Sequence, residues 1–169
     1  MTTIVKPTVG ATGWNTAVDA TIDAVNSMLP AVAGYASSAT TVTNSATVVD
    51  ALGLSVTLAA NSQYVIDGVL RITQAGGTTS GGHKGEFIVP ASATGSWCVH
   101  SASAPNAMTT EVQILAASTG SASFIMKVFG FVTTTTAGTF KYQFAQQTAT
   151  ASRSTTIDIG SYLTLTKIG

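Results

Sequence analysis

The hydrophobic residues of this chain follow a helical period near its start and a strand period over most of its length. The stretch "TGWNTAVDATIDAVNSMLP", Thr12 to Pro30, is the one segment with a convincing helical pattern. Its hydrophobic residues recur at spacings of four, three and four, which places them on one face of a helix. They are Val18, Ile22, Val25 and Leu29. The pattern predicts one amphipathic helix preceded by an extended arm.

This helix is too short to be stable without a partner, since it offers only about two heptads of a hydrophobic seam. Asn15 is a candidate N-cap, Pro30 ends the helix, and Trp14 lies just ahead of the seam. β-Branched residues at both seam positions favour trimers. Two interpretations stay open: the helix is an anchoring and oligomerisation device, or it packs on the β-domain of its own chain.

Residues 31–47 favour the first interpretation. The sequence "AVAGYASSATTVTNSATVV", Ala31 to Val49, contains these residues, is rich in Ala, Ser and Thr, and has no clear period. That composition is typical of a linker. We therefore expect three parts: an arm and helix over 1–30, a linker over 31–47, and a β-domain over 48–169.

From Val48 onward, short alternating segments are separated by turn clusters, which predicts seven or eight antiparallel strands. Each strand should turn its hydrophobic residues to one side. The expected inward-facing residues are Tyr64, Ile66, Leu70, Ile72, Phe87, Val89, Trp97, Val99, Val112, Ile114, Phe140, Tyr142, Phe144, Ile157, Ile159, Leu163 and Leu165. This number of strands in a domain of this size is typical of a sandwich or jelly roll.

One segment departs from simple alternation. "ASFIMKVFGFV" is hydrophobic on both faces except for Lys127. A strand of this kind needs cover on both sides, and we expect the second cover to be a neighbouring subunit. The residues predicted to form a trimer interface are Phe129, Phe131, Tyr142 and Tyr162.

Composition and charge narrow the function classes. Hydrophobic residues make up 45% of the chain and charged residues only 8%, against about 25% in ordinary soluble domains. Seven basic and seven acidic residues give no net charge, so neither nucleic acid nor an anionic membrane is an expected partner. No hydrophobic run approaches the ~18 residues of a membrane span. A neutral surface rich in hydroxyl groups suggests that copies of the chain cover one another.

The single cysteine, Cys98, excludes an intrachain disulfide framework. The start "MTTIVKPTVG" lacks the pattern of a secretory signal. We therefore expect synthesis in a reducing cytoplasm without export by a general secretory route.

Two stretches are similar to a class of tailed-bacteriophage virion proteins with a trimeric jelly-roll domain like that of tumour necrosis factor and C1q. These stretches are "LSVTLAANSQYVIDGVLRI" and "FKYQFAQQTATASRSTTIDIGSYLTLTKI". The opening "GATGWNTAVDATIDAV" resembles the Gly-Trp-Asn start of many phage fibre and decoration proteins. The positions that match are Leu58, Ala60, Asn61, Tyr64, Ala145, Gln146, Gly160, Ser161 and Leu163. The resemblance implies a homotrimer on the virion surface, anchored by its arm and helix to a capsid or tail protein.

The glycine-rich stretch "GGTTSGGHKG", Gly76 to Gly85, does not fit a phosphate-binding loop. The motif needs Lys directly after its last Gly, where this chain has His83, and Ser or Thr after that Lys, whereas Gly85 follows Lys84. No helix follows to hold an anion. The stretch is better explained as a long hairpin loop.

No catalytic or metal site emerges from the other polar residues. Cys98 and His100 share a strand face but lack a third group to orient them. With His83 they provide too few ligands for zinc within one chain. The acidic residues are scattered, without pairs at short spacing. We therefore expect no enzyme activity, no cofactor and no metal.

The sequence thus predicts a mainly β protein with an antiparallel jelly-roll sandwich, and the resemblance implies that it acts as a capsid decoration protein of a tailed phage. The alternative is a tail tip or short tail fibre that binds a host glycan. No sugar-stacking platform is visible, although Trp97 or Tyr162 could contribute to one. A third hypothesis, a trimeric glycoside hydrolase, requires carboxylates from neighbouring subunits about 5–9.5 Å apart.

Overall fold

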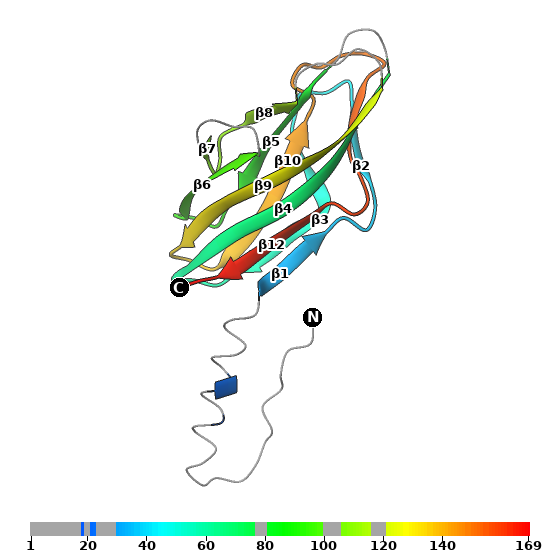
Figure 1. Ribbon diagram of the computed structural model, residues 1–169. Coiled ribbons are helices and arrows are strands. Elements are labelled where there is room, and N and C mark those ends of the chain that lie inside the picture. The colour runs from blue at the N-terminus through cyan, green and yellow to red at the C-terminus, as the bar shows by residue number, and fades with distance from the viewer. Residues whose placement is uncertain (1–17, 19–20, 23–29, 77–80, 100–105, 116–120) are drawn as a thin grey trace.

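The protein is mainly β and forms antiparallel sheets (Figure 1). The computed structural model describes residues 18, 21–22, 30–76, 81–99, 106–115 and 121–169, of which 30–33, 106 and 113–115 are described by their backbone alone. The strands in these ranges are β1 (Pro30–Tyr35), β2 (Thr40–Thr43), β3 (Val49–Leu58), β4 (Ser62–Ala75), β5 (His83–Ile88), β6 (Thr94–Val99), β7 (Asn106–Ala107), β8 (Val112–Leu115), β9 (Ala122–Thr134), β10 (Gly138–Ala145), β11 (Ser154–Ile157) and β12 (Tyr162–Lys167).

The strands form two sheets that face each other across a shared core. The first, sheet A, has the order β1-β12-β4-β9-β6-β7, and β11 joins it by pairing with both β4 and β2. The second, sheet B, has the order β3-β10-β5-β8. Figure 1 shows β12, β4 and β9 in front of β3, β10 and β5. Strand pairs therefore join segments that are far apart in the sequence, such as β1 with β12 and β3 with β10.

The segment expected to be a linker is instead part of the fold. Residues 30–35 form β1, which pairs with β12, and residues 40–43 form β2, which pairs with β11. The alternation in this segment is hard to recognise because the side chains are small. β1, the first strand of this segment, also lies against β3, where a Cβ on Gly34 would come within 2.9 Å of the Gly53 carbonyl oxygen. Within the described residues, the β-structure thus begins at Pro30 and not at residue 48.

The expected N-terminal helix falls mostly outside the described residues. Val18, Thr21 and Ile22 have helical backbone, with Val18 39% exposed. Trp14, Val25 and Leu29 lie outside the described residues. The prediction of one continuous helical seam therefore stays a prediction.

The core confirms most of the expected alternation. On β10, Phe140, Tyr142 and Phe144 are fully buried between the sheets. Phe87 packs edge-on against Trp97 at 5.0 Å between ring centroids and stacks on Phe140 at 4.8 Å. Aromatic pairs in such arrangements add to the hydrophobic contribution of the rings. The aromatic part of the core therefore lies where β6 of sheet A faces the paired strands β5 and β10 of sheet B.

Ile159 departs from the predicted inward face, because it is 52% exposed. β11 ends at Ile157 and β12 begins at Tyr162, so a turn interrupts the alternation between them. In this turn Gly160 has a φ of +88°, and Ser161 Oγ accepts a hydrogen bond from Arg71 N at 2.9 Å. The turn replaces ladder hydrogen bonds and moves Ile159 to the surface.

The glycine-rich stretch does not close a hairpin. It connects the end of β4 in sheet A to the start of β5 in sheet B, so it crosses between the sheets. Residues 77–80 of this connection lie outside the described residues.

Candidate interaction surface

The outward face of sheet A presents large hydrophobic side chains to solvent. β9 alternates as a strand should: Val128 and Val132 are fully buried, whereas Phe129 is 40% exposed and Phe131 is 54% exposed. On the neighbouring strand β4, Val65 is opposite Phe131 and is 42% exposed. Isolated exposed hydrophobic residues are normal, but adjacent ones mark interaction sites. We call the outward-facing group Val65, Phe129, Phe131 and Tyr162 the apolar patch.

The structure brings three of the four predicted interface residues to this face. Phe129 and Phe131 come from β9, and Tyr162 comes from β12, where it is half-buried and opposite Val69 of β4. The fourth, Tyr142, is fully buried in the core of the protomer. It has no surface to present to a neighbouring copy, so we leave it out of the proposed interface.

An ion pair lies within the apolar patch. Lys127 Nζ is 2.9 Å from Asp67 Oδ2, and both side chains are about half exposed, at 53% and 49%. The hydrogen bond to Asp67 and the negative charge of that carboxylate raise the pKa of Lys127. Asp67 is opposite Phe129 in the β4–β9 ladder. The hydrophobic residues and the two charges therefore occupy one continuous stretch of strand surface.

The outward face of sheet B is different, because charged and polar residues form hydrogen bonds across it. Asp50 Oδ2 accepts from Lys141 Nζ at 2.8 Å, and Asp50 Oδ1 accepts from Gln143 Nε2 at 2.6 Å. These two hydrogen bonds lower the pKa of Asp50. Cross-strand pairs of this kind stabilise a sheet face that is exposed to water, and such a face needs no partner subunit.

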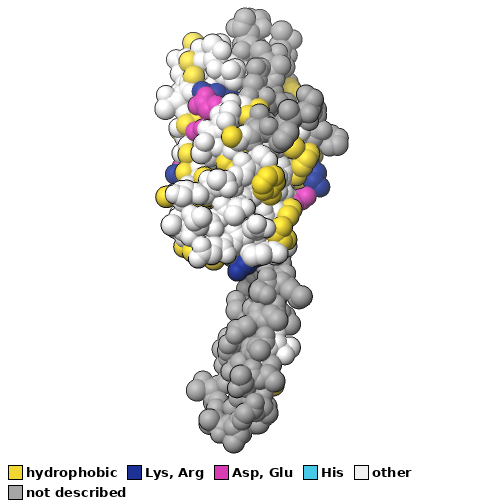
Figure 2. Space-filling model, turned by 90° about the vertical axis from the view of Figure 1, so that its left-hand side faces the viewer, with side chains coloured by type: hydrophobic (Ala, Val, Ile, Leu, Met, Phe, Trp, Pro, Cys, Tyr) yellow, Lys and Arg dark blue, Asp and Glu magenta, His cyan; other side chains and the backbone are white. Residues whose placement is uncertain are grey.

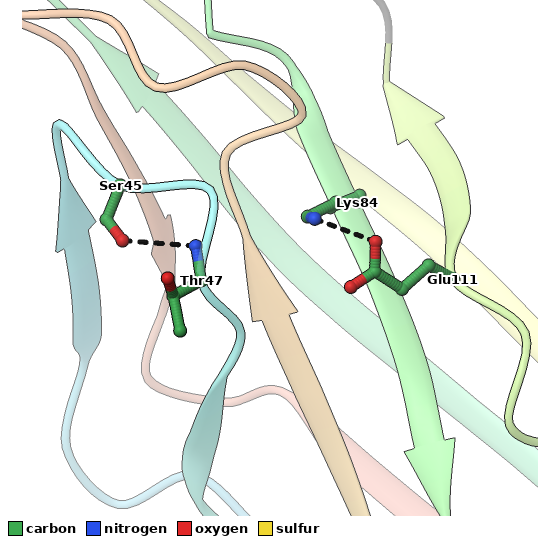
Figure 3. Close-up of polar contacts among 4 residues, drawn as sticks. All are labelled: Ser45, Thr47, Lys84 and Glu111. Carbon is green, nitrogen blue, oxygen red and sulfur yellow. Dashed lines mark hydrogen bonds and ion pairs between the residues drawn. The ribbon is translucent and has the colours of Figure 1, made fainter.

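A second polar group continues along sheet B. Lys84 Nζ lies 2.7 Å from Glu111 Oε2, as Figure 3 shows, and the Lys84 side chain is only 11% exposed. Partial burial and the nearby charge of Glu111 raise the pKa of Glu86. Figure 3 also shows the turn before β3, where Thr47 N donates to Ser45 Oγ at 3.1 Å.

The two faces of the sandwich are therefore asymmetric. Figure 2 views the molecule from the side of the sandwich and shows hydrophobic side chains grouped on the right-hand part of the described surface, beside one basic and one acidic side chain. Sheet B also exposes Leu52 (56%) and Val49 (37%) on β3, but beside hydrogen-bonded charged pairs, whereas sheet A exposes two aromatic side chains on one strand. Such asymmetry is typical of a protein that buries one face against a partner.

The other candidate groups from the sequence do not form a site. Cys98 is half-buried on β6 opposite Phe129, and His100 lies outside the described residues. His83 is fully buried in the core, with Nδ1 2.7 Å from Thr155 Oγ1 and Nε2 3.2 Å from the Tyr142 hydroxyl. Burial lowers the pKa of His83 to about 3. This imidazole is neutral and holds the sheets together through hydrogen bonds.

Within the described ranges, His, Cys, Asp and Glu side chains form no group of three that could hold a metal ion. The helical residues among those described do not amount to a segment with the length and hydropathy needed to cross a membrane. Comparisons with protein-family models, curated proteins and solved structures found no match to this chain.

Part of this surface was not predicted from the sequence. Val65 and Asp67 lie on the polar side of the expected β4 pattern and gave no signal by themselves. Their role depends on the register that sets them opposite Phe131 and Phe129. The available signal was the doubly hydrophobic pattern of β9, which predicted an exposed apolar face but not its neighbours.

Proposed function

We propose that this protein is a homotrimeric structural protein whose copies pack through the outward face of sheet A. The observation that carries this proposal is the group of exposed aromatic side chains on the outward face of sheet A; sheet B exposes Leu52 and Val49 on β3, but beside hydrogen-bonded charged pairs. An obligate interface buries about 2,000 Å² or more of mostly apolar surface. At about 25 cal/mol per Å², hiding such a face strongly favours association.

The strand order supports assigning the sandwich to the jelly-roll class that resembles tumour necrosis factor and C1q. When β1 with β2 and β11 with β12 are each counted as one interrupted strand, β1-β12-β4-β9 in sheet A faces β3-β10-β5-β8 in sheet B. A jelly roll has this form of two four-stranded antiparallel sheets. In this assignment β6 and β7 extend sheet A beyond the jelly-roll strands.

We further propose that the trimer belongs to the virion surface of a tailed phage, as a capsid decoration protein, and that the N-terminal region attaches it to the shell. The support is the sequence resemblance together with the position of this region, which precedes the β-structure beginning at Pro30. A tail tip or short tail fibre is the second candidate, since it would use the same trimer with a glycan site.

Sedimentation equilibrium tests the trimer. The full chain should have a mass near three times 17.1 kDa, and Phe131→Asp should shift it toward the monomer because a carboxylate cannot be buried there without a large cost. Thr57→Asp is the matched control, since Thr57 is exposed on β3 in sheet B. A monomeric wild-type chain at micromolar concentration would overturn the proposal.

Copy number on purified particles separates the two virion locations. Hundreds of copies per particle are expected for a decoration protein, and a handful for a tail tip. Immunogold labelling of intact particles gives the same distinction by position. Absence from particles would refute both.

A further inference from the structure

A second site lies on the sheet A face, beyond the Tyr162 end of the apolar patch. A pocket of about 550 Å³ opens between β4, β9 and the turn after β11. Its residues are Ala39, Arg71, Thr73, Ser123, Phe124, Ile125, Asp158 and Ile159. Arg71 is six residues from Val65 along β4, roughly 20 Å of strand, whereas Tyr162, opposite Val69, is only about two strand positions from Arg71. The pocket therefore borders the Tyr162 end of the apolar patch, lies far from Val65 and Phe131, and is formed within one protomer.

The polar floor of this pocket has a fixed hydrogen-bond direction. Thr73 Oγ1 donates to Asp158 Oδ2 at 2.7 Å, so its remaining capacity is as an acceptor. Ser123 Oγ lies 2.9 Å from Thr73 Oγ1 and must donate to it. The chain of hydrogen bonds thus runs from Ser123 through Thr73 to Asp158. Ser123 Oγ and the carboxylate of Asp158 keep acceptor capacity for a ligand.

Arg71 adds donors beside these acceptors. Its Nη1 donates to the Ile159 carbonyl oxygen at 3.0 Å, which holds the guanidinium at the pocket edge. Among the described residues no carboxylate oxygen lies within ion-pair distance of it. A guanidinium has five N–H donors, so most of them are available.

The walls of the pocket are hydrophobic. Ile125 is 74% exposed and Ile159 is 52% exposed, and both line the same opening as the polar groups. Such large exposed fractions leave two branched side chains ready for contact with the carbon–hydrogen face of a ligand.

These features together restrict the class of ligand. Asp158 disfavours a phosphate or another anion, and Arg71 disfavours a cation, because each would meet a like charge. A lipid would leave the polar floor without partners, at a cost. A neutral polyol satisfies both charges, with hydroxyl groups that donate to Asp158 and accept from Arg71. We propose that this pocket binds a saccharide unit in pyranose form, with its carbon–hydrogen face against Ile125 and Ile159.

Saturation-transfer NMR on the full chain tests this site. The probes are the methyl pyranosides of glucose, galactose, mannose, rhamnose, N-acetylglucosamine and N-acetylgalactosamine. At least one should receive magnetisation from the protein at millimolar concentration. Asp158→Asn should weaken its binding at least tenfold, whereas the matched Asp50→Asn on sheet B should leave it unchanged. Ile125→Ser, at an exposed position that tolerates substitution, should also weaken it.

Loss of saccharide binding and loss of trimer formation can be measured separately. Phe131→Asp should keep saccharide binding, because the pocket belongs to one protomer. The inference is overturned if none of the six probes binds, or if Asp158→Asn and Ile125→Ser, with unchanged melting temperatures, bind as the wild-type chain does.

Discussion

Lys127 Nζ lies 2.9 Å from Asp67 Oδ2 in the middle of a hydrophobic strand face. In a lone protomer this exposed pair contributes little to folding, because water and salt screen it. If a second copy covers the face, the pair is desolvated, and breaking it then leaves an uncompensated buried charge. The same two residues should therefore have little influence on folding and a large influence on association.

Charge reversal at this pair tests that difference. Lys127→Glu places two carboxylates side by side on the apolar patch, so we expect association to weaken at least tenfold in sedimentation, with a melting temperature close to that of the wild type. The double variant Asp67→Lys with Lys127→Glu should recover much of the loss. Lys141→Glu, beside Asp50 on sheet B, is the control and should leave the mass unchanged. Equal weakening by both reversals would contradict the proposed interface.

The buried His83 predicts a loss of stability in acid. Its pKa is lowered from 6.5 to about 3 in the folded chain, so between these values the unfolded chain binds a proton that the folded chain does not. The free energy of unfolding should fall as pH decreases below 6.5, by about 1.4 kcal/mol per pH unit from this group. Above pH 6.5 the effect should vanish.

Denaturant unfolding between pH 7.5 and 4.5 measures this slope. His83→Gln is the variant to compare, since it keeps hydrogen-bonding capacity near Thr155 but does not titrate. We expect the variant to be less stable at neutral pH and to lose less stability on acidification. Parallel curves for the two proteins would show that His83 does not cause the acid dependence.

Substitution of Gly160, in the turn that contains Asp158, should lower the stability of the folded chain. Its φ of +88° lies in the region that L side chains rarely adopt, and an added Cβ would lie 3.2 Å from Arg71 Nη1. Gly160→Ala should cost about 1–2 kcal/mol of stability. Gly160→Asn should cost less, because Asn tolerates left-handed backbone better. A melting temperature that is the same for both variants would argue against strain in this turn.

If the N-terminal region attaches the protein to the particle, a substitution there should weaken attachment without affecting folding. Ile22→Asp places a charge on the predicted helical seam, outside the β-structure that begins at Pro30. The variant should keep its melting temperature and trimer mass but lose incorporation into particles. Thr21→Asp, at the neighbouring exposed position, is the control. Normal incorporation of Ile22→Asp would remove the tether from the proposal.

The sequence determined which side of each regular strand is buried. The alternation around Phe140, Tyr142 and Phe144 predicted their burial correctly, because in a strand successive side chains point to opposite faces regardless of what pairs with it. The same rule failed at Ile159, where a turn interrupts the strand. It also failed to find β1 and β2, since small side chains give a weak pattern.

Only the tertiary structure decided what these strands have as neighbours. The position of Val65 opposite Phe131, and of Asp158 beside Arg71 and Thr73, depends on pairing between segments distant in the sequence. Tyr142, an expected interface residue, is buried because it lies on the inward face of β10, as the alternation with Phe140 and Phe144 had predicted. Side-chain period is a local property of the backbone, whereas register and sheet order follow from the packing of the whole chain. The sequence pattern therefore indicated the exposed face of β9 but could not give its neighbours in the apolar patch or the residues of the pocket.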